Sequence, residues 1–281
     1  MKIIAHISDL HFGREDPRVA EGLVKDLHNL QPMLVINSGD FTQRARRAQY
    51  RSAAEYIKRL PHPQLSVPGN HDIPLFDIFR RFLSPLDRYK EFISDDLFPQ
   101  YVDDDLTVLG INTARSLTWK SGRISNNQIQ EMERILTALP LSNFKIVVTH
   151  HPFLPPPGQE DTKVDLVGRA TSVLEVLERL EVDLLLAGHL HHGYTGDVRT
   201  YYPASNRAII VAQAGTAISN RVRHEPNGYN VIRLKDDTMG IEVRRWSESE
   251  NSFTCADTIQ FTSKNGEWMP LEDSGSIRQI E

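Results

Sequence analysis

Five short runs of β-branched and aliphatic residues each end abruptly in a polar cluster. The runs cover residues 3–7, 33–36, 65–67, 146–148 and 184–187, and the clusters that follow are Ser8-Asp9-Leu10-His11, Asn37-Ser38-Gly39-Asp40, Pro68-Gly69-Asn70-His71-Asp72, Thr149-His150-His151 and Gly188-His189-Leu190-His191. Runs of this kind are typical of buried strands. The pattern predicts five strands whose last residues carry side chains able to do chemistry.

Between several of these runs, apolar residues recur with the spacing of an amphipathic helix. The stripes fall within residues 19–30, 50–57, 129–139 and 173–180, and Ser125 three residues before Gln128 predicts a capping box for the third. Alternating strands and helices predict an α/β sheet with right-handed crossovers. Because such sheets gather ligands at the carboxyl ends of their strands, we expect the five clusters to converge on one rim.

The rest of the chain is richer in strand signals. Runs at 106–111, 209–212, 229–234 and 241–246 predict strands, and Asn265-Gly266 predicts a late hairpin. A second sheet packed on the first is expected to hold them. Without a linker or repeat, we expect one domain over residues 1–272, with the motifs in 9–192, a β-rich part in 205–270 and a frayed polar tail at 273–281.

Composition narrows the class of protein. A chain of 281 residues with 40% hydrophobic content can bury a core without disulfides, and the single cysteine, Cys255, excludes a disulfide framework and a cysteine metal site. The net charge of −5 argues against a dedicated nucleic-acid binder. With neither a signal-peptide pattern nor an apolar run of the ~20 residues that a membrane helix needs, a cytoplasmic enzyme without a membrane span is expected.

The five clusters together offer oxygen and imidazole donors but no sulfur. The candidate metal ligands are Asp9, His11, Asp40, Asn70, His150, His189 and His191. This mixture suits manganese, iron or zinc better than calcium or magnesium, whose sites use oxygen alone. So many donors exceed what one ion usually takes from a protein. Two neighbouring ions would use them all, with the carboxylate of Asp40 as the best candidate for a bridge.

The ordered motifs from Asp9 to His191 resemble those of a known protein superfamily. Asp-x-His, Gly-Asp, Gly-Asn-His-Asp, His and Gly-His-x-His, each after an apolar run, resemble the calcineurin-like metallophosphoesterase superfamily. The resemblance implies a four-layer αββα sandwich of two mixed β-sheets with a dinuclear metal site at the carboxyl ends of the strands. It implies one ion held by Asp9, His11, Asp40 and His191, and another held by Asp40, Asn70, His150 and His189. Asn70 is also implied to contact the substrate phosphate.

Local details narrow the branch of the superfamily. Phosphoprotein phosphatases carry a second Asp where this chain has Gln43, and a Glu where it has Asp72. The stretches Ser8–Phe12, Gly69–Asp72 and Gly122–Ile124 look more like the bacterial class III cyclic-nucleotide and glycerophosphodiester phosphodiesterases. The resemblance thus implies a phosphodiesterase acting on small phosphorylated substrates, with manganese or iron as its metals and zinc as an alternative.

In the expected mechanism, a metal-activated hydroxide attacks phosphorus in line with the leaving oxygen. His71 is expected to protonate that oxygen or to stabilise its charge, with a structural or phosphate-orienting role as the alternative. His151 and His192, which flank proposed ligands, are candidates for substrate binding or for support of the metal ligands. Arg115, Lys120, Arg221 and Arg223 are candidates for holding a second charged group of the substrate, although surface solvation is the simpler interpretation. The basic residues Arg44 to Arg51 are interpreted as a solvated helix face.

Other functions stay open at this stage. The same site would serve a phosphomonoesterase or a nucleotide pyrophosphatase, and the fold also suits a nuclease, which the negative charge disfavours. A non-catalytic scaffold would be expected to lack metal ligands, whereas all are present here. The sequence leaves the oligomeric state open, including a homo-oligomer in which the β-rich part pairs with another subunit or covers the pocket.

Overall fold

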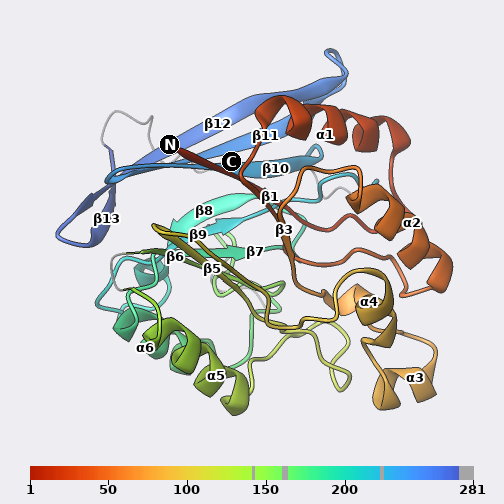
Figure 1. Cartoon of the computed structure of the whole chain (residues 1–281), viewed down its shortest axis with the longest axis horizontal. Helices are drawn as coiled ribbons and strands as arrows, with labels where there is room; N and C mark the ends of the chain where they lie inside the picture. The colour runs from red at the N-terminus through yellow and green to blue at the C-terminus, as the bar shows by residue number, and fades with distance from the viewer. Residues whose placement is uncertain (141–142, 160–163, 222–224, 272–281) are drawn as a thin grey trace.

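The computed structural model describes residues 1–140, 143–159, 164–221 and 225–271 (Figure 1). The predicted tail at 273–281 and Arg223 lie outside the described residues. The helices are α1 (Pro17–Leu30), α2 (Arg47–Ile57), α3 (Ile78–Leu83), α4 (Asp87–Phe92), α5 (Asn126–Thr137) and α6 (Ala170–Arg179), with a 3-10 turn at Asn70–Asp72. The strands are β1 (Lys2–Ile7), β2 (Leu34–Asn37), β3 (Gln64–Ser66), β4 (Gln100–Val102), β5 (Leu106–Gly110), β6 (Phe144–Val148), β7 (Leu184–Ala187), β8 (Tyr194–Asp197), β9 (Ile210–Gln213), β10 (Gly228–Lys235), β11 (Thr238–Ser247), β12 (Ser252–Lys264) and β13 (Glu267–Pro270).

The strands form two mixed sheets. The first has the order β13-β12-β11-β10-β1-β2-β3, parallel from β1 to β3 and antiparallel from β1 outward to β13. The second has the order β4-β5-β6-β7-β9-β8, with four parallel central strands and an antiparallel strand at each edge. Helices α5 and α6 lie below the second sheet in Figure 1, and α1 and α2 lie beside the first. The predicted αββα sandwich is confirmed.

Three apolar layers hold the sandwich together, and strand alternation assigns residues to them. In β6, Ile146 and Val148 face the first sheet, whereas Val147 faces α5 and α6. In β1, Ile4 joins the layer between the sheets, and Ala5 and Ile7 pack against α1 and α2. The central strands of each sheet are therefore buried on both faces, which explains why they are continuous apolar runs.

The four predicted helical stripes are all helices, and the starts of α1 and α5 follow capping rules. Asp16 accepts hydrogen bonds from the first turn of α1, where Pro17 needs no backbone donor. Ser125 and Gln128 form the predicted capping box of α5. Among the described residues, none of the helices combines the length and the apolar character needed to cross a bilayer.

The assignment of strands to sheets differs from the sequence prediction. The five motif-bearing strands do not share one sheet, because β1, β2 and β3 lie in the first and β6 and β7 in the second. The late strands β10 to β13 extend the first sheet, where β10 pairs antiparallel with β1, instead of forming a separate one. Hydrophobic pattern predicts which faces of a strand are buried, but not which strand lies next to it. The Asn265-Gly266 hairpin between β12 and β13 is confirmed.

The layer between the sheets should dominate stability. Ile146 is fully buried there, so Ile146→Ala is expected to lower the free energy of unfolding by about 2–5 kcal/mol, and Ile146→Val by about 0.5–1.5 kcal/mol. Ile78→Ala is the matched control, because that side chain is 65% exposed, and it should change stability by less than about 0.5 kcal/mol. Urea unfolding measures all three. Equal losses for Ile146→Ala and Ile78→Ala would contradict this assignment of the core.

Candidate metal centre

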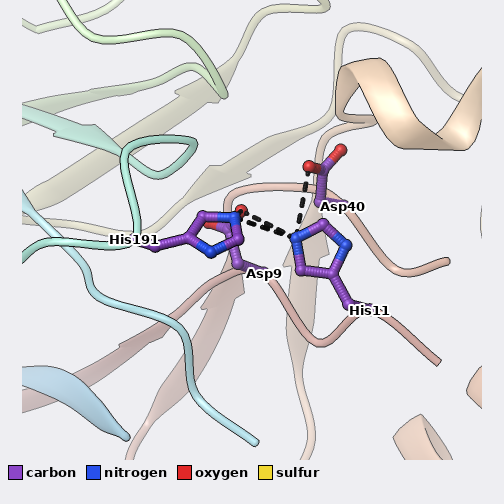
Figure 2. A group of neighbouring side chains, drawn as sticks. All are labelled: Asp9, His11, Asp40 and His191. Atoms are coloured by element: carbon purple, nitrogen blue, oxygen red, sulfur yellow. Dashed lines mark hydrogen bonds and ion pairs between the residues drawn. The ribbon is translucent and has the colours of Figure 1, made fainter. Parts of the chain in front are cut away.

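The polar clusters from both sheets meet at one rim of the sandwich. Asp9 and His11 follow β1, Asp40 follows β2, His150 follows β6, and His189 and His191 follow β7. Backbone hydrogen bonds tie neighbouring loops together, from Asp9 N to Gly39 O at 3.0 Å and from His11 N to Asp40 O at 2.9 Å. Figure 2 shows Asp9, His11, Asp40 and His191 turned toward one another. The predicted convergence of distant strand ends is therefore seen.

The backbone at this rim is strained. Asp9, His11, Asp40, His189 and His191 all have positive φ angles, between 47° and 79°. Residues with a Cβ rarely adopt this left-handed conformation, and such strain persists only where surrounding structure enforces it. Five of the predicted ligands share this feature. The left-handed backbone directs the side chains of each loop toward the same small volume. Because these strained residues are concentrated at one rim, they indicate a functional site.

Two glycines make this packing possible. Gly39 has a φ of 106°, a conformation that favours glycine. A Cβ on Gly69 would collide with the backbone nitrogen and the carboxylate of Asp40. The glycines of the Gly-Asp and Gly-Asn-His-Asp motifs therefore let the loops after β2 and β3 approach each other around the Asp40 side chain.

One donor group consists of Asp9, His11, Asp40 and His191, whose ligand atoms all lie within 4.8 Å of one another. His11 Nε2 is 3.4 Å from Asp9 Oδ1 and 3.6 Å from Asp40 Oδ2, and His191 Nε2 is 3.1 Å from Asp9 Oδ1. The Nε2 atoms of the two histidines are 3.0 Å apart. All four residues are buried.

A second donor group adjoins the first through Asp40. His150 Nε2 lies 3.5 Å from Asp40 Oδ2 and 3.1 Å from Asn70 Oδ1. His189 Nδ1 lies 3.0 Å from the same amide oxygen. Together the two groups bring all seven predicted ligands to one place, with Asp40 between them.

The tautomers of two histidines can be derived from their outer partners. His150 Nδ1 donates to the carbonyl of Ser38 at 2.7 Å, and His191 Nδ1 donates to the carbonyl of Arg221 at 3.0 Å. A carbonyl only accepts, so the neutral ring presents an unprotonated Nε2 to the centre. Metal-binding histidines are commonly oriented by such a bond.

The donor set fits bound cations. Asp9 Oδ1 and Asp40 Oδ2 are buried yet receive no hydrogen bond from the described part of the chain. Buried carboxylate oxygens without a donor are costly, and here the groups that face them are the ring nitrogens of histidines. Divalent ions would satisfy these atoms together. The mixture of imidazole and carboxylate suits first-row transition metals, and Asp40 is placed to contact two of them.

The charges at the centre are strongly coupled. Burial would raise the pKa of Asp9, but His191 and His11 hold it well below its usual range; burial would also raise the pKa of Asp40, and His150 and His71 hold it low. Burial would lower the pKa of His150, but Asp40 more than reverses this and raises it to about 9. Without metal, a proton on His150 compensates the carboxylates, so a cation must displace that proton when it binds.

His71 lies over the first donor group, with its ring edge-on to His11 at 4.8 Å between centroids. Its Nδ1 is 2.8 Å from the carbonyl of Gln43, which leaves Nε2 as the nitrogen that can exchange a proton at the centre. The carboxylate of Asp72, the next residue, accepts hydrogen bonds from the backbone of Phe41, Thr42 and Gly69, so it fixes the loops. The carbonyl of Gln43 orients the ring of His71.

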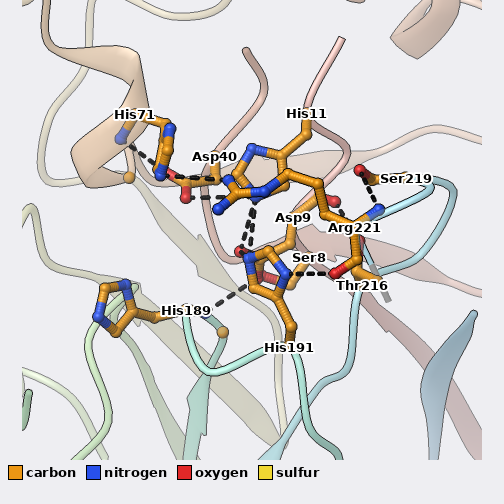
Figure 3. A network of polar contacts seen from close by, with 12 residues as sticks. Ser8, Asp9, His11, Asp40, His71, His189, His191, Thr216, Ser219 and Arg221 are labelled. Carbon is orange, nitrogen blue, oxygen red and sulfur yellow. Dashed lines mark hydrogen bonds and ion pairs between the residues drawn. The ribbon is translucent and has the colours of Figure 1, made fainter. Parts of the chain in front are cut away.

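Two arginines lie beside His71. Arg221 Nη1 is 3.3 Å from His71 Nε2, and Arg44 Nη1 is 3.4 Å from His71 Nδ1 (Figure 3 labels His71 and Arg221). The interpretation of Arg44 as part of a solvated helix face is wrong, because α2 begins only at Arg47 and Arg44 belongs to the loop that carries Asp40. The sequence signal that could have placed Arg44 at the centre was its position five residues after Gly39 of the Gly-Asp motif. Ser8 and Thr216 also donate hydrogen bonds to Asp9, but no sequence pattern identified them.

The two remaining candidates, His151 and His192, are placed differently. His151 is buried against His189, and its ring nitrogens contact Thr113 Oγ1 at 2.7 Å and the carbonyl of Lys120 at 2.6 Å. This geometry favours support of the centre over contact with substrate. His192 is partly exposed, and its Nδ1 is 3.1 Å from Glu225 Oε1. It lies at the edge of the centre, where substrate contact stays a prediction.

The sequence profile of the calcineurin-like phosphoesterase family matches residues 3–193, about two thirds of the chain. The chain belongs to the calcineurin-like phosphoesterase family. Family membership supports a hydrolase that acts on phosphoesters. Among similar phosphoesterases are a probable cyclic nucleotide phosphodiesterase of Xenorhabdus bovienii, 25% identical over 68% of this chain and 78% of that protein, and the glycerophosphodiester phosphodiesterase GpdQ of Enterobacter lignolyticus, 28% identical over 54% of this chain and 58% of that protein.

Solved structures of phosphatases share the fold of this calcineurin-like phosphoesterase. A purple acid phosphatase from yellow lupin (Lupinus luteus) superposes with a TM-score of 0.69 at 13% identity, covering 93% of this chain and 53% of that one. A dimetal phosphatase from Danio rerio superposes with a TM-score of 0.64 at 17% identity, covering 87% of this chain and 96% of that one. At these identities the likeness establishes the fold alone.

Because Asp40 belongs to both donor groups, Asp40→Asn should weaken both. We expect the variant to lose more than about 100-fold in manganese affinity, beyond the 10–100-fold typical of residues that only support a ligand. The parent, but not the variant, should gain about 2.7 kcal/mol of stability when manganese is present at 100 times its Kd. Metal content by mass spectrometry and thermal unfolding are the measurements. Exposed Asp104→Asn is the control, and parent-like metal content in Asp40→Asn would disprove the shared role.

Proposed function

We propose that this calcineurin-like phosphoesterase is a dinuclear-metal-dependent phosphodiesterase acting on small substrates such as cyclic nucleotides or glycerophosphodiesters. The observation that carries the proposal is the pair of adjoining donor groups that share Asp40, with His71 beside them. The names of the relatives support the choice of a diester, since they include a probable cyclic nucleotide phosphodiesterase and a glycerophosphodiester phosphodiesterase.

The proposal assigns Asp9, His11, Asp40 and His191 to one ion, and Asp40, Asn70, His150 and His189 to the other. Manganese or iron is the proposed pair, with zinc as the alternative. Bound ions of this kind acidify a water molecule and offset the charge that builds on phosphoryl oxygens. Asn70 is held by its amide nitrogen to the carbonyl of Trp119 at 3.3 Å, which fixes its oxygen toward His150 and His189.

The arginines and His71 complete the proposed site. Arg221 and Arg44 place two positive charges at the ring of His71, where an anionic phosphoryl group would be attracted. His71 Nε2 is proposed to give a proton to the leaving oxygen, because Nδ1 is committed to the Gln43 carbonyl. A phosphomonoesterase is the alternative function on the same residues, since this site also has enough positive charge for a dianion.

A comparison of ester types tests the proposed diesterase. Manganese-loaded protein is expected to hydrolyse bis(p-nitrophenyl) phosphate with a higher kcat/KM than p-nitrophenyl phosphate, in line with the diesterase names of the relatives. Cyclic nucleotides and glycerophosphodiesters then identify the natural class. A clear preference for the monoester would replace the diesterase with the alternative.

A change at His71 tests its role in proton transfer. His71→Gln is expected to lower kcat by about 10²–10⁴-fold on a glycerophosphodiester, whose alkoxide must be protonated to leave. The loss should be much smaller on bis(p-nitrophenyl) phosphate, because nitrophenolate leaves without a proton. His28→Gln, on the exposed side of α1, is the control and should keep parent activity. Equal losses on both substrates would leave His71 a binding or structural role.

A further inference from the structure

A second concentration of positive charge lies away from the metal ligands, where the starts of α5 and α6 approach each other. An open cavity of about 240 Å³ is lined there by Arg115, Arg123, Ser125, Asn126 and Arg169. None of these residues belongs to the proposed metal centre. Figure 1 shows α5 and α6 side by side on the outer face of the second sheet, and Ser125 and Arg169 are the residues just before them.

The three arginines have no carboxylate partner within the part of the chain that the structure describes. Arg115 donates to the Arg123 carbonyl at 3.0 Å and to Gln128 Oε1 at 3.2 Å, and Arg169 donates to the side chain of Asn126. Burial, with Arg123 and Arg169 nearby, lowers the pKa of Arg115. The like charges therefore repel one another in the absence of an anion.

Two arginines within α5 and α6 have carboxylate partners. Arg134 of α5 pairs with Glu131 at 2.6 Å, and Arg179 of α6 pairs with Glu133 at 2.8 Å. These two solvated arginines are thus balanced by neighbouring carboxylates. The cavity arginines have no such carboxylate among the described residues, and they lie together around one cavity.

The backbone holds these arginines in place. Arg123 and Gly168 form a parallel bridge, in which Gly168 N donates to the Gly122 carbonyl at 2.8 Å. Arg169 follows in the left-handed region, with a φ of 69°. This strained residue begins α6, whose first turn has neither a side-chain cap nor an acidic residue. The positive ends of both helix dipoles add to the arginine charge.

We propose that this cavity binds a phosphoryl dianion, either free or as the end group of a small phosphorylated molecule. Three guanidinium groups offer planar, paired donors that match phosphate oxygens, and neutralising them would relieve their mutual repulsion. The proposal goes beyond the function of the metal centre and does not depend on it.

The cavity is connected to the metal centre through one loop. Residues 115–123 join Arg115 to Arg123, and between them the carbonyl of Trp119 accepts from Asn70 while the carbonyl of Lys120 contacts His151. An anion that bridges Arg115 and Arg123 would tie together the two ends of this loop. The site is thus placed to sense a phosphorylated molecule beside the catalytic residues.

Calorimetric titration of the manganese-loaded protein with orthophosphate tests the proposal. The parent is expected to bind two phosphates, one at the metal centre and one in the cavity. The double variant Arg123→Gln/Arg169→Gln should bind only one, and each single variant should weaken the cavity site by at least about tenfold. Arg134→Gln/Arg179→Gln is the matched control, because it removes two arginines of α5 and α6 that do not line the cavity, and it should bind like the parent.

The outcomes separate cleanly. Methylphosphonate carries its dianionic group on carbon, so it distinguishes a site for any phosphoryl group from a site for free phosphate. The proposal is supported if the cavity variant alone loses the binding of either ligand. Unchanged stoichiometry and affinity in the cavity variant, confirmed as folded by its melting temperature, would overturn it. Hydrolysis of bis(p-nitrophenyl) phosphate is measured in parallel, so failure of the diesterase proposal would appear in the parent's activity, whereas the cavity proposal is judged by the difference in phosphate binding between the parent and the cavity variant.

Discussion

The structure at the rim depends on two buried carboxylates, those of Asp9 and Asp40. Each has an oxygen without a hydrogen-bond donor, and the groups that face these oxygens are histidine nitrogens, not lysine or arginine. A buried carboxylate pair of this kind is tolerable only when positive charge lies beside it. In the chain alone, protonated histidine supplies that charge, and bound ions would supply it better because they contact several acceptors at once. The burial that makes these unpaired carboxylate oxygens costly also favours the binding of cations beside them.

This constraint explains why the site spans two sheets. Asp9, His11 and Asp40 come from the first sheet, and His150, His189 and His191 come from the second. The apolar layer between the sheets therefore fixes the relative position of the two halves. It also has to offset the backbone strain of five left-handed residues, each of which costs about 1–3 kcal/mol. The stability gained by packing in the interior thus offsets the backbone strain at the rim.

The sequence predicted the residues of the site more completely than it predicted the order of the strands in the sheets. Strand ends, helix stripes and the cap at Ser125 follow from local periodicity and side-chain chemistry, which neighbouring residues determine. The pairing of β10 with β1 is a contact between residues more than two hundred positions apart, and no local pattern specifies it. For the same reason Arg221, which orients His191 through its carbonyl and reaches His71 through its side chain, stayed an unresolved candidate. Arg44 was misassigned because helix periodicity was extended past the true start of α2.

The distribution of charge gives the last constraint on ligands. The net charge of −5 disfavours a long polyanion, which needs an extended basic surface. Arginines nevertheless gather where a single phosphoryl group would lie, with Arg44 and Arg221 beside His71 and three more in the cavity between α5 and α6. At about 0.15 M salt, screening acts over roughly 8 Å, so local clusters outweigh the overall charge for a small ligand. The distribution of charge is therefore consistent with a hydrolase of small phosphoesters.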